Sequence, residues 1–328
     1  VILWIMFDKE YYSEIIEKAI AEIDYGKGPR GLFLPVEYTL EGGGKRLRPM
    51  LLLATCEALG SEPEKAITQA VGIEMFHNFT LLHDDVMDKA EVRRGRPTVH
   101  RRWNESVAIL SGDAMLTMAT QLVVKCTDIY TADCMAEILN LFNTTAMEVY
   151  AGQQLDMEFE SRRDVTVEEY IEMIRLKTSV LLACACKMGA LMAGASEKDA
   201  DAMYRYGELL GLAFQLQDDN LDTYGDPALF GKEIGGDIIN EKKTWLWINA
   251  MNREPKRLQR VLDQKLTDYL KIREVRKIYD DLNLKEEAQT LIERYANEAV
   301  EALADVDMTP EARDFFTSLA LKSAARSH

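Results

Sequence analysis

Residues 81–88 read Leu-Leu-His-Asp-Asp-Val-Met-Asp, and residues 214–222 read Phe-Gln-Leu-Gln-Asp-Asp-Asn-Leu-Asp. Each stretch ends a segment of helical periodicity with the pattern D-D-x-x-D. On a helix, positions i and i+4 share a face and position i+1 lies about 100° away, so each cluster directs two or three carboxylates at one spot. Carboxylates so near to one another destabilise a fold unless a cation neutralises their charge. Mg²⁺ prefers oxygen ligands and also bridges to phosphates. The two clusters together predict a cavity that holds a diphosphate through metal ions.

The remaining sequence has the composition of an all-α protein. The chain of 328 residues is 47% hydrophobic and has only 8 prolines, and its long segments rich in Ala, Leu, Glu, Lys, Met and Ile favour helix. No run alternates strictly between apolar and polar residues beside an Asn-Gly or Asp-Gly turn, so a substantial sheet is not expected. No Ser- or Pro-rich linker divides the chain. We therefore predict one helical domain over residues 1–328.

Charge and cysteine content exclude some classes of protein. The chain has 39 Lys and Arg against 55 Asp and Glu, a formal net charge of −16. This excess argues against a nucleic-acid partner, which requires a basic surface. A polyanionic ligand of such a protein needs metal ions and a local basic pocket. The five cysteines form no C-x-x-C pair, so we expect reduced thiols in a cytoplasmic protein rather than a disulfide or zinc site.

The N-terminal run, residues 1–7, is apolar but far shorter than the ~20 residues that span a bilayer. It also lacks the basic flank and cleavage site of a signal peptide. Two alternatives stay open: a short N-terminal extension that packs on the domain, or residues foreign to the native chain. No other segment stays uncharged long enough to cross a membrane, so no membrane span is expected.

Two basic loops are candidate phosphate sites. Residues 42–49 read Gly-Gly-Gly-Lys-Arg-Leu-Arg-Pro, in which the glycines let backbone N–H groups approach an anion and Lys45 and Arg48 supply charge. This is not a P-loop, because G-x-x-x-x-G-K-[ST] is absent. Arg93 and Arg94 follow the first cluster closely enough to bring guanidinium groups back toward it. The alternative for both loops is a surface turn with solvated side chains.

Further basic residues accompany the second cluster. Lys177 and Thr178 sit in an apolar helical segment, and Lys232 and Lys242 belong to or follow the glycine-rich loop at residues 225–237. Each lysine would meet a phosphate oxygen if its segment lines the cavity; otherwise it extends to solvent, and Thr178 bonds to its own helix. The loop is a candidate lid that excludes water from a bound ligand.

Aromatic residues precede the first cluster. Phe76 and Phe79 lie one to two helical turns before Asp84. They are either ordinary core residues or the floor of a cavity that extends from the metal ions and limits the length of what fits.

The order of these motifs resembles that of the trans-isoprenyl diphosphate synthase (polyprenyl synthetase) family, whose short-chain members make farnesyl and geranylgeranyl diphosphate. The resemblance covers about residues 30–250. A single motif of this kind is weak evidence, whereas seven in order are specific. They are G-G-K-R-x-R-P at 43–49, L-x-H-D-D-x-x-D at 81–88, R-R-G-x-P-T at 93–98, G-D at 112–113, K-T at 177–178, F-Q-x-x-D-D-x-x-D at 214–222, and G-K with G-D-I-x-x-x-K-x-T at 231–244.

The resemblance implies an all-α isoprenoid synthase fold of roughly a dozen helices around a deep central cavity, generally in a homodimer. It also implies a Mg²⁺-dependent prenyltransferase that condenses isopentenyl diphosphate head to tail (1′-4) with dimethylallyl, geranyl or farnesyl diphosphate. Three Mg²⁺ ions, which Mn²⁺ can replace, would be bound by Asp84, Asp85, Asp88, Asp218, Asp219 and Asp222. The allylic diphosphate would contact Arg93, Lys177, Gln215, Lys232 and Lys242, and isopentenyl diphosphate would contact Lys45, Arg48, His77 and Arg94. The dipoles of Thr178 and Gln215 would stabilise the allylic cation.

The same resemblance gives an expectation for product length. Phe79, five positions before the first aspartate, resembles the bulky residue that stops the growing chain in short-chain enzymes, and Phe76 and Thr80 complete the expected floor. Thr80 is smaller than the second aromatic of many animal-type farnesyl synthases, and the first cluster has two intervening residues rather than the four typical of bacterial ones. We therefore expect geranylgeranyl diphosphate (C20), with farnesyl diphosphate (C15) as the alternative.

Two more remote alternatives remain. A class I terpene cyclase normally has N-D-x-x-S-x-x-x-E where this chain has its second D-D-x-x-D. A non-catalytic partner subunit of a prenyl synthase tends to lose metal-binding aspartates, and this chain has all six.

Overall fold

The computed structural model describes residues 7–125, 130–225 and 234–325. Its contacts divide the chain into two compact units. Unit 1 comprises Val1–Asn143, Cys184–Asp201 and Asp307–Ala312, and unit 2 comprises Thr144–Ala183, Ala202–Val306 and Arg313–His328. The predicted all-α class is confirmed, because the strands found in the described residues form only one short hairpin. That residues 1–328 form a single domain stays a prediction.

Unit 1 contains the first aspartate cluster and the glycine-rich basic loop. Its elements are α1 (Lys9–Ala21), α2 (Arg30–Leu40), α3 (Leu47–Ala58), the 3₁₀ helix η1 (Pro63–Ala66), α4 (Ile67–Met87), β1 (Val92–Arg93), β2 (Arg96–Pro97), α5 (Val99–Arg102), α6 (Glu105–Val123), and parts of α7 (Ala132–Ser161), α9 (Val180–Met192) and α10 (Glu197–Tyr224).

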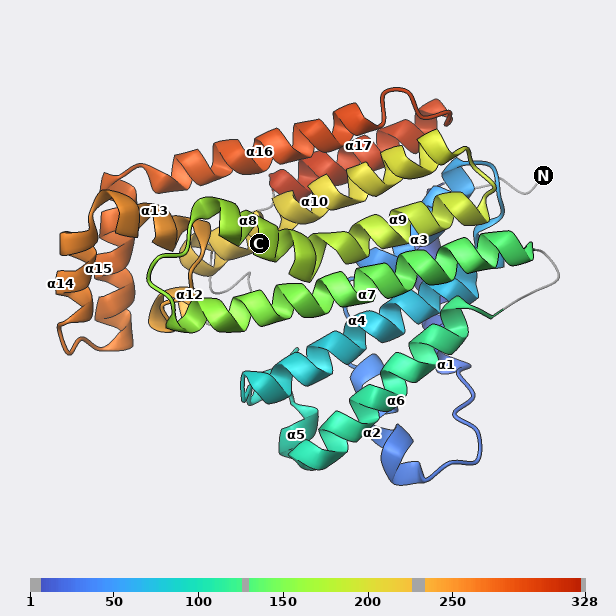
Figure 1. Ribbon diagram of the computed structural model, residues 1–328, viewed down its shortest axis with the longest axis horizontal. Coiled ribbons are helices and arrows are strands. Elements are labelled where there is room, and N and C mark those ends of the chain that lie inside the picture. The colour runs from blue at the N-terminus through green and yellow to red at the C-terminus, as the bar shows by residue number, and fades with distance from the viewer. Residues whose placement is uncertain (1–6, 126–129, 226–233, 326–328) are drawn as a thin grey trace. The chain divides into compact units, whose positions relative to one another are not determined.

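Helix α4 is the centre of unit 1 and lies along α6 (Figure 1). Two glycines permit this close approach. A Cβ on Gly72 of α4 would lie 3.1 Å from the Ala119 carbonyl oxygen of α6, and a Cβ on Gly112 of α6 would lie 2.1 Å from the His83 ring of α4. Of the 21 residues of α4, 12 are buried, so packing fixes the position of the helix and of the aspartate cluster at its end.

Helix α6 is an exception to the expectation that no segment past the N-terminus could span a membrane. Among the described helices it alone is long and apolar enough by length and composition, with a mean hydropathy of 1.3 over its most apolar window. A core helix meets the same two criteria, and α6 packs along α4.

Unit 2 contains the second aspartate cluster on α10. Its other elements are the second part of α7, α8 (Val167–Ile174), the π-helical turn η2 (Arg175–Ser179), the start of α9, α12 (Gly236–Ile239), α13 (Trp245–Arg253), α14 (Pro255–Leu262), α15 (Asp268–Asp281), α16 (Leu284–Ala302) and most of α17 (Pro310–Ala324).

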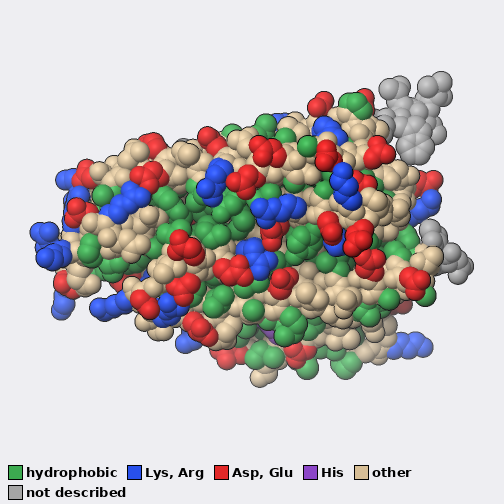
Figure 2. All heavy atoms as spheres, turned by 45° about the horizontal axis from the view of Figure 1, so that its top comes forward, with side chains coloured by type: hydrophobic (Ala, Val, Ile, Leu, Met, Phe, Trp, Pro, Cys, Tyr) green, Lys and Arg blue, Asp and Glu red, His purple; other side chains and the backbone are tan. Residues whose placement is uncertain are grey.

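The core of unit 2 joins α8, α10, α13, α15 and α16 through buried aromatic and aliphatic side chains such as Tyr170, Leu216, Trp247, Tyr279 and Ile292. This packing fixes the segment of α10 that carries the second cluster. On the face shown in Figure 2, Asp and Glu side chains lie interspersed with Lys and Arg.

Candidate active site

The first aspartate cluster forms the last turn of α4. Asp84 and Asp85 lie within the helix, and Asp88 caps its C-terminus. Lys89 then adopts a left-handed backbone with φ of 52°, and the Ala90 N–H donates to the Asp85 carbonyl at 3.0 Å, which ends the helix. The C-terminal end of a helix carries partial negative charge, so three carboxylates there are unfavourable unless a cation joins them. This end of α4 is therefore a candidate cation site.

Arg93 lies against this cluster. Its Nε and Nη2 are both 2.7 Å from Asp85 Oδ1, and Nη2 is 4.0 Å from Asp84 Oδ2. Asp85 is buried, and its burial raises the pKa of its carboxyl although Arg93 opposes the shift. A guanidinium has five N–H donors, so Arg93 keeps donors for a phosphate while it holds Asp85.

The hairpin of β1 and β2 carries the arginine pair. Arg94 and Gly95 form its two-residue turn with φ of 51° and 74°, the left-handed conformations that such a turn requires. Arg94 Nη1 donates to the Gly43 carbonyl, and a Cβ on Gly44 would lie 2.9 Å from the Arg94 guanidinium. The absence of a side chain at Gly44 thus lets Arg94 lie against the glycine-rich loop.

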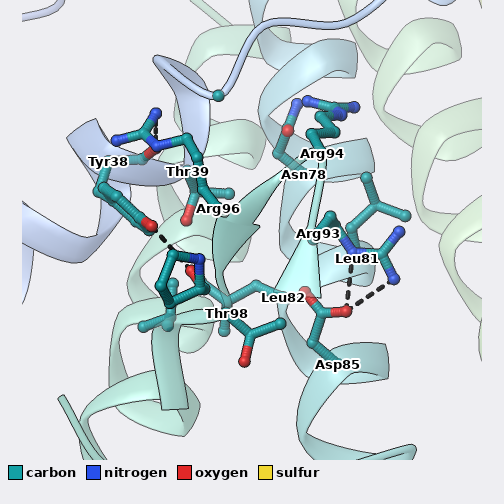
Figure 3. A pocket seen from close by; sticks show the side chains of 13 residues that line it. Tyr38, Thr39, Asn78, Leu81, Leu82, Asp85, Arg93, Arg94, Arg96 and Thr98 are labelled. Carbon is teal, nitrogen blue, oxygen red and sulfur yellow. Dashed lines mark hydrogen bonds and ion pairs between the residues drawn. The ribbon is translucent and has the colours of Figure 1, made fainter. Parts of the chain in front are cut away.

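An open pocket lies between this hairpin and helices α2 and α4. Figure 3 shows Asp85 and Arg93 in contact on one side of it, with Tyr38 and Arg96 on another. It encloses about 400 Å³, including the part continuous with solvent. Three arginines and one buried carboxylate around one concavity suit an anion and its metal ion. The lining residues are Tyr38, Thr39, Gly42, Asn78, Leu81, Leu82, Asp85, Arg93, Arg94, Arg96, Pro97, Thr98 and Val99.

Two further residues predicted to bind isopentenyl diphosphate are in contact with each other. Arg48 Nη1 lies 3.3 Å from His77 Nε2. Burial, reinforced by Arg48, holds the pKa of His77 well below its usual range, so its ring is neutral and accepts from the guanidinium. Lys45, on the preceding loop, is exposed.

The predicted floor residues belong to the core of unit 1. Phe79 is buried, and its ring centroid lies 5.5 Å from that of Phe76 and 4.8 Å from that of His83. Phe76 is fully buried against Phe142, with ring centroids 5.2 Å apart. Thr80 Oγ1 donates to the His77 carbonyl at 2.8 Å. A prenyl chain entering this region would therefore meet closely packed aromatic rings.

In unit 2, the second cluster is built into a buried hydrogen-bond network. Asp219 accepts from Tyr170 Oη at 2.6 Å and from Gln215 Nε2 at 2.8 Å, so each of its oxygens has a donor. Gln215 Oε1 in turn accepts from Thr178 Oγ1 at 3.0 Å. Burial raises the pKa of Asp219 to about 7, and Lys242 opposes the shift. Because Thr178 donates its proton to Gln215, its lone pairs are left for an electron-poor ligand.

Lys177 and Lys242 share an acidic neighbour on α7. Lys177 Nζ lies 2.6 Å from Asp156 Oδ2. Burial alone would raise the pKa of Asp156, but Lys242 and Lys177 together hold it below its usual value. The structure therefore brings together two of the predicted phosphate-binding lysines around one carboxylate.

Asp222 closes the second cluster. Its Oδ2 accepts from the Asp237 N–H at 2.9 Å, and its carbonyl accepts from the Gly235 N–H at 2.7 Å, which fixes the start of α12. Lys232 and most of the predicted lid at 225–237 lie outside the described residues, as do most of residues 1–7.

The comparisons with known proteins agree on one family. The family model of the polyprenyl synthetases matches residues 30–282. The chain belongs to the polyprenyl synthetase family. It is 41% identical over 243 residues, 74% of each chain, to a protein of Methanosarcina mazei named geranylgeranyl diphosphate synthase. A crystal structure of a geranylgeranyl pyrophosphate synthase superposes with a TM-score of 0.92 at 39% identity, covering 98% of this chain and 99% of that one. The corresponding synthetase of Pyrococcus horikoshii gives 0.90 at 32% identity, covering 97% of both chains.

Magnesium fits the donors of this polyprenyl synthetase. Both clusters offer carboxylate oxygens, and His83, next to Asp84, instead directs Nε2 to the Ile109 carbonyl at 3.0 Å. Across the three described ranges, no three His, Cys, Asp or Glu side chains converge as a finished metal site. Mg²⁺ is typically held by one or two carboxylates, with waters and substrate phosphates completing its shell.

Asp156 and Tyr170 were not predicted from the sequence to belong to the site. Asp156 meets Lys177 across 21 positions of the chain, and Tyr170 meets Asp219 across 49. Neither residue belongs to a motif with short spacing, and a lone acid or tyrosine on an amphipathic helix carries no local signal. Only the fold of the prenyltransferase reveals that they hold site residues in place.

The π-helical turn Arg175–Ser179 was not predicted from the sequence either. It contains Lys177 and Thr178. Such a widened turn is frequent at functional sites. Two glycines of neighbouring helices press on this segment: a Cβ on Gly152 would lie 2.3 Å from the Lys177 backbone nitrogen, and one on Gly211 would lie 2.5 Å from Ser179 Cα. The turn therefore has little room to move.

Gly152→Ala is expected to destabilise the enzyme and lower its kcat. The new methyl group meets backbone, so the Lys177 turn must shift, at a cost of about 1–3 kcal/mol. A shift of about 1 Å in a positioning segment lowers kcat by up to about 100-fold. Urea unfolding and steady-state kinetics measure both effects. Gly31→Ala on α2 is the matched control, because nothing lies within 4 Å of its Cβ and a helical alanine is favourable. Wild-type stability and kcat in Gly152→Ala would contradict the close contact.

Proposed function

We propose that this polyprenyl synthetase catalyses the Mg²⁺-dependent head-to-tail (1′-4) condensation of isopentenyl diphosphate with allylic diphosphates, and that its main product is geranylgeranyl diphosphate. The observation that carries the proposal is the arrangement within unit 1. The Asp85–Arg93 contact and the Arg94–Gly43 contact join the metal-binding end of α4 to the glycine-rich basic loop. A metal-dependent anion site and a second, purely basic anion site therefore lie side by side, as a reaction of two diphosphates requires.

The residues have distinct roles in the proposal. Asp84, Asp85, Asp88, Asp218, Asp219 and Asp222 would hold three Mg²⁺ ions, which Mn²⁺ could replace. Arg93, Lys177, Gln215, Lys232 and Lys242 bind the allylic diphosphate, and Lys45, Arg48, His77 and Arg94 bind isopentenyl diphosphate. Asp219 keeps Gln215 and Tyr170 as partners, and a carboxylate has lone pairs beyond those two bonds for a metal-bound water or an ion.

The chemistry follows from these roles. Magnesium held by these aspartates would neutralise charge on the allylic diphosphate and make it a better leaving group. Lys177, Lys242 and Arg93 donate to its oxygens, which stabilises the charge that develops as the allylic C–O bond breaks. Thr178 donates to Gln215, which donates to Asp219, and the Thr178 lone pairs that this leaves would stabilise the allylic cation. Lys45, Arg48 and neutral His77 hold isopentenyl diphosphate with its double bond toward that cation. After the C–C bond forms, the proton passes to the released diphosphate.

Farnesyl diphosphate as the only allylic primer tests the product length. Phe79 stops the chain at C20 in this proposal, so farnesyl diphosphate is extended once, to geranylgeranyl diphosphate, and no further. A C15 synthase would leave farnesyl diphosphate unextended when dimethylallyl diphosphate is consumed in a parallel reaction. Mass spectrometry of the products distinguishes the two outcomes.

We further propose that the enzyme is a cytoplasmic homodimer. Helix α6 carries exposed apolar side chains at Ile109 and Leu110, 47% and 60% exposed, which supports self-association. Light scattering on the purified protein is expected to give twice the 37.3 kDa chain mass. A mass equal to that of one chain at micromolar concentration would contradict the dimer.

A further inference from the structure

Arg46 stands between two residues assigned to isopentenyl diphosphate, Lys45 and Arg48, but turns away from them into the core. It is 4% exposed, whereas Lys45 is exposed and Arg48 partly so. Its backbone is left-handed, with φ of 46° and ψ of 34°, and it immediately precedes α3. A non-glycine residue in this conformation is uncommon and requires support from its surroundings.

That support comes from three separate segments. Arg46 Nη1 lies 2.7 Å from Glu74 Oε1 on α4, and Nε lies 2.7 Å from Glu17 Oε1 on α1. Nη2 donates to the Leu40 carbonyl at the end of α2 at 2.7 Å and to Glu17 Oε2 at 3.3 Å. The planar fork of a guanidinium can satisfy all of these acceptors at once, whereas a lysine ammonium cannot.

The contacts of Arg46 extend to the diphosphate-binding side chains. Glu74 also accepts from Asn78 Nδ2 at 2.9 Å, and Asn78 lines the pocket of Figure 3. Glu74 lies one turn before His77 on α4, and His77 contacts Arg48 at 3.3 Å. A closed ring therefore runs from Arg46 along the chain to Arg48, across to His77, back along α4 to Glu74, and across to Arg46.

The loop before Arg46 needs such an anchor. Three glycines precede Lys45, and two of them, Gly43 and Gly44, have φ of 71° and 139°. Glycines give a loop freedom that must be lost when the loop binds a ligand. An anchor at Arg46 fixes the end of the loop before the ligand arrives.

We propose that Arg46 is a positioning residue for isopentenyl diphosphate, which sets Lys45 and Arg48 in their binding orientation through its buried contacts with Glu74, Glu17 and the Leu40 carbonyl. The inference rests on the proposed function, because it concerns one of the two substrate sites. A positioning role differs from a purely structural role in its kinetic consequence, because only the binding of isopentenyl diphosphate is weakened.

The Arg46→Lys variant tests this inference, since it keeps the buried positive charge and removes the fork. We expect the KM for isopentenyl diphosphate to rise about 10- to 100-fold, the usual effect of losing a residue that orients binding groups. The KM for farnesyl diphosphate and kcat are expected to stay within about threefold of wild type, because binding of one substrate alone is weakened.

Two further variants separate positioning from folding. Arg313→Lys is the matched control: Arg313 also holds backbone carbonyls, with Nη2 2.8 Å from the Val306 oxygen, but it lies in unit 2. It is expected to lower the Tm without raising either KM. The double variant Arg46→Met with Glu74→Gln leaves no unpaired charge between these two positions and keeps an acceptor for Asn78. It is expected to fold and still to show the raised KM for isopentenyl diphosphate.

The inference is overturned if Arg46→Lys raises both KM values alike, or lowers only the Tm as Arg313→Lys does. Lys45→Ala and Arg48→Ala distinguish this failure from failure of the site assignment. If they raise the KM for isopentenyl diphosphate and Arg46→Lys does not, only the positioning role of Arg46 is lost. If none of the three changes that KM, the assignment of this loop to isopentenyl diphosphate is wrong.

Discussion

Asp84→Ala and Asp218→Ala are each expected to lower kcat by about 100- to 1000-fold, the usual effect of removing one group that stabilises charge in the transition state. Each variant deletes a carboxylate from a different cluster, so in the proposed mechanism each would lose part of the shell that holds magnesium on the allylic diphosphate. Asp84 lies in the last turn of α4, where the helix dipole disfavours a negative charge, so its removal does not weaken that helix.

Steady-state kinetics and circular dichroism together measure this result. Asp201→Ala is the matched control on α10, because Asp201 is exposed and makes only a surface pair with Lys187 at 2.5 Å. It is expected to retain wild-type kcat. If Asp84→Ala and Asp218→Ala both keep full turnover while the control behaves as expected, the mechanism with two metal clusters is wrong.

Phe79→Ala is expected to lengthen the product beyond C20. The Phe79 ring lies on α4 between Phe76 and His83, with centroids 5.5 and 4.8 Å away. Deleting a buried phenyl ring costs about 3–5 kcal/mol when the cavity stays empty. A longer prenyl tail that fills this space recovers part of that cost, so the enzyme continues to extend a chain that the wild type releases.

Product analysis by mass spectrometry, with farnesyl diphosphate as primer, measures the change. Phe316→Ala is the control for stability alone. Phe316 is fully buried in unit 2 and packs on Tyr206 with ring centroids 5.3 Å apart, so its loss is expected to lower the Tm and leave the product at C20. An unchanged product from folded Phe79→Ala would exclude Phe79 as the floor.

Local sequence signals were sufficient to predict the helices and the two aspartate clusters. The apolar periodicity before Asp84 and Asp218 marks long helices, and the glycines and prolines between them mark the loops. The apolar stripe of each helix is itself a local pattern, and packing then buries that side of the helix. Arg93 lies beside the first cluster because only a short connection separates it from α4.

The supporting contacts of the site depend on distant parts of the chain and had no such signal. Arg46 reads as one more basic residue of a phosphate-binding loop, yet its partners Glu17 and Glu74 lie 29 and 28 positions away, and it is buried. The π-helical turn at Lys177 packs against Gly152 of another helix, 25 positions away in the chain, where a Cβ would lie 2.3 Å from the Lys177 backbone nitrogen. Tertiary packing overrides local preference at both places.

The proposed reaction is a magnesium-dependent condensation that stops at twenty carbons. Mass spectrometry of the products formed from isopentenyl and dimethylallyl diphosphate, with Mg²⁺ or with EDTA, examines both of its features at once. We expect geranylgeranyl diphosphate as the longest major product with Mg²⁺ and no condensation product with EDTA. A cyclic hydrocarbon, no product with Mg²⁺, or equal product formation with EDTA would contradict the proposed function.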